Sequence, residues 1–281
     1  MENERIKWPD DARCAVMLSF DVDGETTWAN GNRGFEGGNN FIRSLSIGQY
    51  ETRRCIRRIL DLLGKYGIKG TFYVPGWVAE RNEPMIREIF SHGHELGHHG
   101  YTHERFYDKT YEEQAEIIDR SQEIFKKITG KAATGFRTPS GDWAEGTPGL
   151  LVKKGFKYSS SMRGDDRPYR TEFEGQESDF IEIPTRWELD DYVQMAYNLY
   201  PAEPVGQDRI SGYDNVLDNF IREFDGYYRY GLCCAFMMHP QVIGTPGRIL
   251  LLERLIRHIQ SHPDVWIATG EQIADWWREN Y

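Results

Sequence analysis

Residues 14–25 read CAVMLSFDVDGE, an apolar run that leads directly into a cluster of acidic side chains. The run has the length and composition of a buried β-strand, because it carries Val, Met, Leu and Phe without a charge. Asp21 and Asp23 follow its apolar part. In an α/β barrel the carboxyl ends of the strands meet at one face, where active sites are built. This stretch therefore predicts both the first strand of a sheet and the position of the chemistry.

The rest of the chain alternates short apolar segments with amphipathic helical ones. Helices are expected at residues 49–66, 84–91, 111–129, 148–154, 215–229, 248–261 and 271–280. Further strands are expected at residues 69–76, 94–100, 133–139, 156–162, 180–185, 232–240 and 264–270. About seven or eight such units in one α/β domain predict a distorted (β/α)7-8 barrel. The alternative is a doubly wound open sheet, although no Gly-x-Gly-x-x-Gly motif follows the first strand.

The alternation breaks at about residues 163–213, a stretch rich in Trp, Tyr and acidic residues. A long connection of this kind in a compact domain usually serves as a lid or a binding element. We therefore expect a single domain over residues 1–281, with an irregular insertion at about 163–213. The insertion is expected to roof the mouth of the barrel and to close a groove into a pocket.

Composition and charge exclude several classes of partner. A net charge of −10 gives no overall electrostatic attraction for nucleic acid or for an anionic membrane. The N-terminal segment is charged, and no window approaches the roughly 18–20 apolar residues of a membrane span. We therefore expect a cytoplasmic protein without nucleic-acid or membrane partners. The cysteines are expected to be buried, reduced thiols: Cys14, Cys55, Cys233 and Cys234.

Reactive side chains fall where the expected strands end. They are Asp21 and Asp23 after the first strand, His99 and His103 after the third, Arg137 at the end of the fourth and His239 at the end of a late strand. Two histidines and one carboxylate leave open metal positions for water and a substrate oxygen, as a catalytic site requires. We predict that Asp23, His99 and His103 hold a metal ion.

Residues 92–104 carry five histidines, and this density allows a competing interpretation. His94-Glu95-Leu96-Gly97-His98 matches His-Glu-x-x-His, the zincin signature, in which both histidines share one face of a helix. Gly93, Gly97 and Gly100 each cost about 1 kcal/mol of helix propensity, which disfavours this interpretation. A third alternative is that the histidines are surface residues and the aspartates cap a loop.

Taken together, these residues resemble the motifs of the polysaccharide deacetylase superfamily, carbohydrate esterase family 4. The resemblance runs from Ala15 to about Trp277. The matching segments are Asp21-Val22-Asp23, the spacing of His99 and His103, Arg137-Thr138-Pro139-Ser140-Gly141, and Met237-Met238-His239. Two departures are Gly100, where the family usually has a hydroxyl residue, and Met237, where it has Leu. The fourth motif is not cleanly present, and the segment most similar to it is Trp187-Glu188-Leu189-Asp190-Asp191.

Other segments are similar to one sub-branch of that family. Residues 158–162 (YSSSM), 165–169 (DDRPY) and 183–187 (IPTRW) resemble cyclic imidases and allantoinase-like members. Peptidoglycan deacetylase-like proteins without a secretion signal share these segments. Allantoinase-like members are expected to lack the metal triad, which this chain keeps, so the comparison favours imidase or deacetylase chemistry.

The resemblance also implies a set of roles. One divalent metal is expected, with Zn²⁺ favoured and Co, Mn and Ni as alternatives. Asp21 is expected to act as general base, Arg137 to hold Asp21 ionised and His239 to protonate the leaving nitrogen. Asp190 or Asp191 is expected to keep His239 protonated. The expected substrate-binding residues are Pro139, Gly141, Trp143, Trp187, Asp190 and Asp191.

Three functions follow from these residues. The favoured one is hydrolysis of a non-peptide carbon–nitrogen bond in a small cyclic imide, hydantoin-like or ureide compound. The second is deacetylation of an N-acetyl sugar, as in chitin or peptidoglycan. The third is a non-catalytic carbohydrate-binding protein, against which the retained base, acid and metal ligands count. The expected partner is thus a small-molecule or glycan substrate. The sequence also allows a homo-oligomer.

Overall fold

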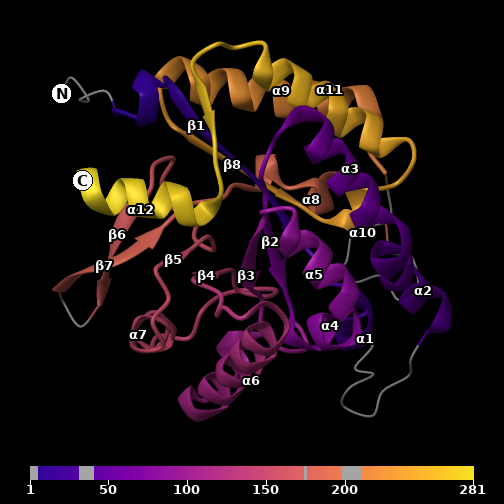
Figure 1. The fold of residues 1–281 in the computed structure, drawn as a ribbon, viewed down its shortest axis with the longest axis vertical. Helices are drawn as coiled ribbons and strands as arrows, with labels where there is room; N and C mark the ends of the chain where they lie inside the picture. The colour runs from indigo at the N-terminus through magenta and orange to yellow at the C-terminus, as the bar shows by residue number, and fades with distance from the viewer. Residues whose placement is uncertain (1–5, 32–40, 174–175, 198–209) are drawn as a thin grey trace.

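The structure is a computed structural model of the chain, in which residues 6–31, 41–173, 176–197 and 210–281 are described. One curled sheet has the strand order β6-β7-β5-β4-β3-β2-β1-β8, with β9 paired to β1 (Figure 1). The strands are β1 (Cys14–Asp21), β2 (Thr71–Val74), β3 (Glu95–His98), β4 (Gly135–Phe136), β5 (Tyr158–Ser159), β6 (Tyr169–Phe173), β7 (Gln176–Glu182), β8 (Cys233–Met238) and β9 (Val265–Ile267). Among these described strands, every pairing is parallel except that of β6 with β7.

Helices cover the outside of this sheet, and α9 and α11 lie together over β1 and β8 (Figure 1). The helices are α1 (Thr26–Gly31), α2 (Ile42–Tyr50), α3 (Ile56–Tyr66), α4 (Gly76–Arg81), α5 (Glu83–Ser91), α6 (Tyr111–Thr129), α7 (Thr147–Lys153), α8 (Asp191–Met195), α9 (Tyr213–Tyr230), α10 (Pro240–Ile243), α11 (Arg248–Gln260) and α12 (Gly270–Asn280). Strands that alternate with helices give parallel neighbours because each helix returns the chain to the same end of the sheet. The expected α/β barrel is therefore confirmed, in a distorted and only partly closed form.

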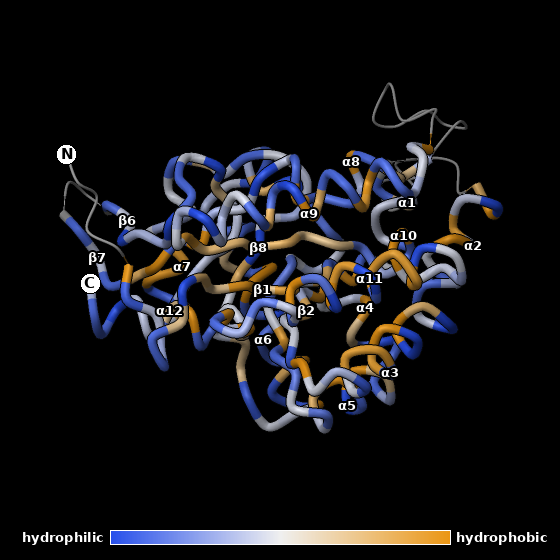
Figure 2. The backbone as a smooth tube through the Cα atoms, turned by 90° about the horizontal axis from the view of Figure 1, so that it is seen from above, coloured by the Kyte–Doolittle hydropathy of each residue, from blue (hydrophilic) through white to orange (hydrophobic). Residues whose placement is uncertain are grey.

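Strand β1 lies at the centre of the core, and all eight of its residues are buried. β8 runs along residues 15–20 of β1, whereas β9 pairs with residues 14–16 and β2 with residues 19–21. A parallel strand covered on both faces is expected to be apolar without alternation, as the CAVMLSF run is. Figure 2 shows the hydrophobic stretches of β1 and β8 side by side within the molecule.

The sheet curls until the chain that follows β7 lies beside β8. Asp190 forms an isolated parallel bridge with Met237, and the amide of Cys233 donates to the carbonyl of Asp166 at 3.4 Å. The bridge places the end of β8 next to the segment that leads into α8, whereas the bond of Cys233 joins the start of β8 to the chain before β6. As a result, side chains that are distant in sequence meet at the carboxyl end of the barrel.

Several expected strands are shorter in the structure, among them those at 133–139 and 156–162, and the short helices α1, α4 and α10 were not expected. Two further differences bear on the site. The helix expected at 49–66 is α2 and α3 joined by a π-helical turn over Glu51–Cys55, and the helical pattern does not show this break. The insertion expected at 163–213 contains the β6–β7 hairpin and α8; its residues 198–209, which include Tyr200, lie outside the described part. The hairpin was not predicted because its sequence, YRTEF in β6, does not have the apolar character of a core strand.

Helix α6 has the bounds that its apolar periodicity predicts, Tyr111–Thr129. It begins at a capping box in which Thr110 and Glu113 bind each other's backbone amides, and it ends at Gly130, whose φ of +80° is the left-handed conformation that favours glycine. The cysteines are buried and free, as expected. None of the described helices is long and apolar enough to cross a membrane.

Candidate metal and catalytic centre

Three side chains from two strand ends converge on one buried point. Asp23 lies in the turn after β1, and His99 and His103 lie in the loop after β3. Each histidine Nε2 is 3.5 Å from Asp23 Oδ1, and one ligand atom of each residue lies within 4.8 Å of the others. All three side chains are buried. The structure thus brings together the residues expected to hold the metal.

The protonation states of these groups fit a metal site. His99 Nδ1 lies 2.8 Å from the carbonyl oxygen of Arg137, which can only accept, so Nε2 keeps its lone pair. Burial lowers the pKa of His103 to about 4. Burial alone would raise the pKa of Asp23, but His103 and His99 hold it below its usual range. Two imidazoles and one carboxylate are the donors that a catalytic metal requires.

One oxygen of Asp23 has no hydrogen-bond partner among the residues that the structure describes. Its Oδ2 accepts a hydrogen bond from Thr27 Oγ1 at 2.8 Å, whereas Oδ1 is buried without a hydrogen bond. Leaving a buried carboxylate oxygen without a partner is costly. Because this oxygen faces both imidazoles, the residues present fit a divalent cation.

The loop that carries the histidines is shaped by glycine and by backbone caps. Gly100 has φ +72°, and a Cβ there would lie 2.8 Å from Glu104 Oε2 and 2.9 Å from Pro139. Glu104 accepts hydrogen bonds from the amides of Tyr101 and Thr102. The departure at Gly100 from the usual hydroxyl residue therefore has a local cause, which is the close packing of this turn. His103 itself has φ +62°, a conformation that costs a non-glycine residue about 1–2 kcal/mol.

Asp21 lies between the three converging side chains and His239. Its Oδ1 accepts a hydrogen bond from Arg137 Nη1 at 2.7 Å. Its Oδ2 is 3.9 Å from His99 Nε2 and 4.0 Å from His239 Nε2. A carboxylate in this position can exchange a proton with a group bound between the two histidines.

Arg137 is a fully buried cation whose nitrogens are all paired. It donates to the carbonyl and the hydroxyl of Ser160 and to Ser19 Oγ, each at 2.8 Å, besides Asp21. Its guanidinium also lies 4.2 Å from the ring centroid of Tyr73. An arginine held in this way orients the carboxyl group of Asp21.

His239 directly follows β8 and is paired with an acid from α8. Its Nδ1 is 2.8 Å from Asp191 Oδ1, which also accepts the backbone amide of His239 at 2.9 Å. Burial lowers the pKa of His239, but Asp191 and Asp190 outweigh burial and raise that pKa well above 6.5. Asp190 is 3.8 Å from the ring and caps α8 through the amide of Tyr192. Of the two acids left open by the sequence, Asp191 is the direct partner.

The expected substrate-binding residues lie around the mouth with different exposure. Trp187 is 57% exposed, and its ring lies 3.8 Å from the guanidinium of Arg163. Trp143 is half-buried, Pro139 is buried beside the histidine loop, and Gly141 is exposed with φ +98°. Asp190 and Asp191 are both buried. Their role in binding a substrate stays a prediction.

Sequence reasoning missed two polar residues near the site. Glu51 is fully buried under the turn of Asp23, where it accepts the amide of Gly24, and burial raises its pKa well above 4.5. Arg163 follows β5, and burial lowers its pKa although Asp190 and Asp21 oppose this effect. Glu51 had no signal in the sequence, because it is turned inward by the π-helical turn before Ile56, which the helical pattern does not show. Arg163 had no signal either, because it stands in a polar stretch.

The zincin interpretation is wrong. His94 immediately precedes β3, and Glu95 and His98 belong to that strand, so the motif is not helical. The Nδ1 of His94 accepts the amide of Gly70 at 3.1 Å. His98 is buried against aromatic rings, with Phe136 stacked on it at 5.5 Å. Both imidazoles therefore serve the packing of the sheet.

Comparisons with known proteins find relatives that match most of the chain. The family description Polysaccharide deacetylase matches residues 48–159. A peptidoglycan deacetylase of Helicobacter pylori is 31% identical over 92% of this chain and 94% of its own length. A peptidoglycan deacetylase-like protein of Gibberella zeae is 25% identical over 93% and 86%.

Solved structures show the same fold. A Mycobacterium smegmatis protein assigned to the polysaccharide deacetylases superposes with a TM-score of 0.90 and 29% identity, over 99% of this chain and 95% of its own. The Puue allantoinase superposes with a TM-score of 0.84 and 22% identity, over 100% and 95%. These two structures therefore share the barrel fold with this chain over nearly its whole length.

Proposed function

Because the chain belongs to the polysaccharide deacetylase family, we propose that it hydrolyses a carbon–nitrogen bond of a small cyclic imide or amide with the help of one divalent metal ion. Hydrolysis of an amide bond is the chemistry of the family. The proposal adds the metal, the roles of individual residues and the size of the substrate. Each addition is supported by a different feature of the buried centre.

Asp23, His99 and His103 would hold the metal, since their donor atoms converge and one of them lacks any other partner. When bound, such an ion polarises the scissile carbonyl and lowers the pKa of a water molecule. Two imidazoles and one carboxylate suit Zn²⁺, and Co, Mn and Ni accept the same donors.

Asp21 and His239 divide the proton transfers between them. Asp21, paired with Arg137, accepts a proton from the attacking water while the oxygen of that water bonds to the carbonyl carbon. His239, protonated because of Asp191, donates a proton to the nitrogen as the carbon–nitrogen bond breaks. Without that proton the leaving amide anion would be too basic to depart. The 4.0 Å between His239 Nε2 and Asp21 Oδ2 is short enough for both groups to reach one amide unit.

The burial of the reacting groups supports a small substrate. Asp21, Asp23, His99, His103 and His239 are each no more than 8% exposed. The ring of Tyr192 lies 4.9 Å from that of His239 and narrows the approach from the side of α8. Buried reacting groups that are approached past an aromatic ring favour a flat, compact ligand over a polymer.

Deacetylation of an N-acetyl sugar is the second candidate. It is favoured by the relative named peptidoglycan deacetylase, whose whole length this chain nearly covers. It is also favoured by the exposed Trp187, because an indole at the mouth can pack against a sugar ring. The chemistry would be unchanged, and the substrate would enter with its acetamide group alone.

A substrate panel separates the two candidates. Purified protein is assayed with succinimide, dihydrouracil, hydantoin and N-acetylglucosamine oligomers, and Asp21→Asn serves as the inactive control. We expect turnover of at least one cyclic compound that Asp21→Asn abolishes. Turnover of oligomers longer than a disaccharide, with no activity on any cyclic amide, would transfer the function to the second candidate.

A further inference from the structure

A second group of metal-binding side chains lies at the opposite end of the barrel. Asp225 is in α9, His258 is in the last turn of α11 and His262 follows that helix. One ligand atom of each lies within 4.8 Å of the others. α9 ends just before β8 begins, whereas His239 follows the other end of β8. The group is therefore separate from the catalytic centre.

Contacts already hold these side chains in place. His258 Nε2 is 2.7 Å from Asp225 Oδ1, and the two imidazole rings are 5.1 Å apart. His262 Nδ1 lies 3.0 Å from the carbonyl oxygen of His258. Since that oxygen can only accept, Nε2 of His262 keeps a free lone pair.

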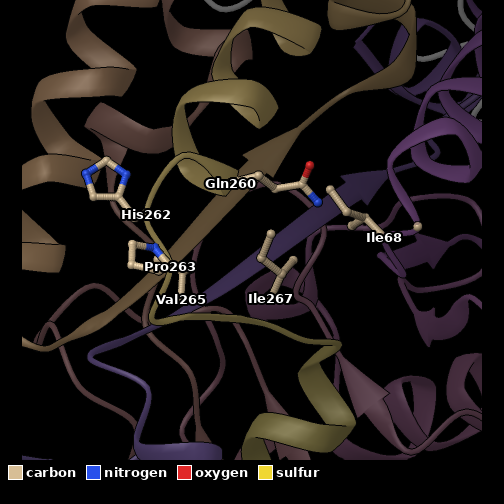
Figure 3. Close-up of a pocket in the computed structure, with 7 residues that line it drawn as sticks. Ile68, Gln260, His262, Pro263, Val265 and Ile267 are labelled. Atoms are coloured by element: carbon tan, nitrogen blue, oxygen red, sulfur yellow. The ribbon is translucent and has the colours of Figure 1, made fainter.

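Aromatic rings orient both imidazoles. The ring of Phe224 lies 5.6 Å from that of His258 and 5.0 Å from that of His262, and Tyr228 lies 4.5 Å from His262. His262 also stands at the edge of a surface hollow, on the side away from Ile68 (Figure 3). The cluster thus has fixed walls on one side and access to solvent on the other.

From this geometry we propose that Asp225, His258 and His262 form a second site for a divalent transition metal such as Zn²⁺, Ni²⁺ or Cu²⁺. An ordinary surface ion pair accounts for Asp225 and His258 but not for the second imidazole at the same point. Histidines four positions apart with a carboxylate are a ligand set of these metals. Asp225 and His258 retain 50% and 28% side-chain exposure, so water molecules can complete the coordination.

An ion at this point would join α9 to α11. These two helices pack against each other over β1 and β8, and the ligands come from both. Since the unfolded chain does not hold the three residues together, binding favours the folded state and raises the unfolding temperature as the metal concentration rises. The site would act as a clamp and would not take part in catalysis.

The test counts bound metal in matched variants. The folded, full-length protein is stripped with a chelator, titrated with Zn²⁺ or Ni²⁺ and analysed by calorimetry and elemental analysis. We expect two sites in the unchanged protein, loss of one in His99→Ala and loss of the other in His262→Gln. The double variant should bind none, and circular dichroism verifies that each variant is folded.

His92→Gln provides the control for a surface imidazole. His92 Nδ1 also contacts the carbonyl oxygen four residues earlier, that of Glu88, at 2.7 Å, but His92 belongs to no such cluster among the described residues. This variant should keep both sites and the metal-dependent rise in unfolding temperature. The proposal is overturned if His99→Ala binds no metal at micromolar concentration, or if His262→Gln and His92→Gln lose the same amount.

Discussion

At the scale of single residues, one hydrogen bond sets the pH range of the proposed acid. Asp191 is hydrogen-bonded to His239 and keeps the pKa of the His239 imidazole well above 6.5. The protonated imidazole is the active form, so activity is lost as the pH rises through that pKa. Asp191→Asn removes the charge and lowers the pKa of His239. We expect the alkaline limb of the kcat/KM profile to move to lower pH.

The neighbouring acid supplies the control for this shift. Asp190→Asn removes a carboxylate that is 3.8 Å away and is not hydrogen-bonded to the ring, so its alkaline limb should move less. If the kcat/KM profiles of Asp191→Asn and of the unchanged protein coincide, Asp191 does not raise the pKa of His239.

Asp21→Asn tests the proposed base. The amide cannot accept the proton of the attacking water, so we expect kcat to fall by about 10²–10⁴-fold. Because Asp21 is not among the three converging ligands, metal stoichiometry should stay the same. Retention of near-normal kcat, or loss of the metal together with activity, would contradict the assignment.

His99→Ala tests the ligand set against a histidine of the same segment. It removes one of three donors, so we expect metal affinity to fall by at least tenfold, as measured by competition with a chromophoric chelator. His94→Ala is the matched change, because His94 is buried but bonded to the amide of Gly70. A larger loss of affinity in His94→Ala than in His99→Ala would reject the proposed set.

At the scale of elements, the loop after β3 depends on a glycine that is both left-handed and crowded. Gly100→Ala places Cβ 2.8 Å from Glu104 Oε2 and should disturb the caps that position His103. Gly67→Ala, after α3, has φ +66° with nothing within 4 Å. Both changes should lower the free energy of unfolding by about 1–2 kcal/mol. Urea denaturation measures the free energy of unfolding. Activity should fall in Gly100→Ala alone. Equal losses of activity in the two variants would contradict the argument that a Cβ at residue 100 is crowded.

Elements were predictable where one local pattern decided them. β1 is a buried parallel strand, so its apolar run and its end could be read directly. α6 could be read from its apolar period and from Gly130. The β6–β7 hairpin could not, because its pairing of Tyr169 with Glu182 is a tertiary choice. The π-helical turn before α3 likewise depends on packing against the turn of Asp23.

At the scale of the whole molecule, the positions of the ligands were predictable because a parallel sheet brings all strand ends to one face. This argument alone places Asp23 with His99, and Asp21 with Arg137. It could not choose between Asp190 and Asp191. That choice depends on the bridge between Asp190 and Met237, which forms only when the sheet closes.

Removal of the metal should lower the stability of the whole fold. Asp23 and His99 belong to different strand ends, and the ion would replace the missing partner of a buried oxygen. The His262→Gln variant isolates this site from the one proposed between α9 and α11. In that background, a metal concentration about 100 times Kd should stabilise the protein by roughly 2.7 kcal/mol. Calorimetric unfolding temperatures that do not respond to the metal would argue against binding at Asp23.

The origin of His239's partner has a consequence for how such a protein can diverge. The reacting groups stand on strand ends, whereas the aromatic neighbours Trp187 and Tyr192 stand on the segment that leads from β7 into α8. A lineage could exchange that segment and acquire a new substrate while it inherits the reaction. Yet the segment also delivers Asp191 to the imidazole. A segment that replaces it must therefore also place a carboxylate beside His239 Nδ1. This one requirement limits which replacements would keep the reaction.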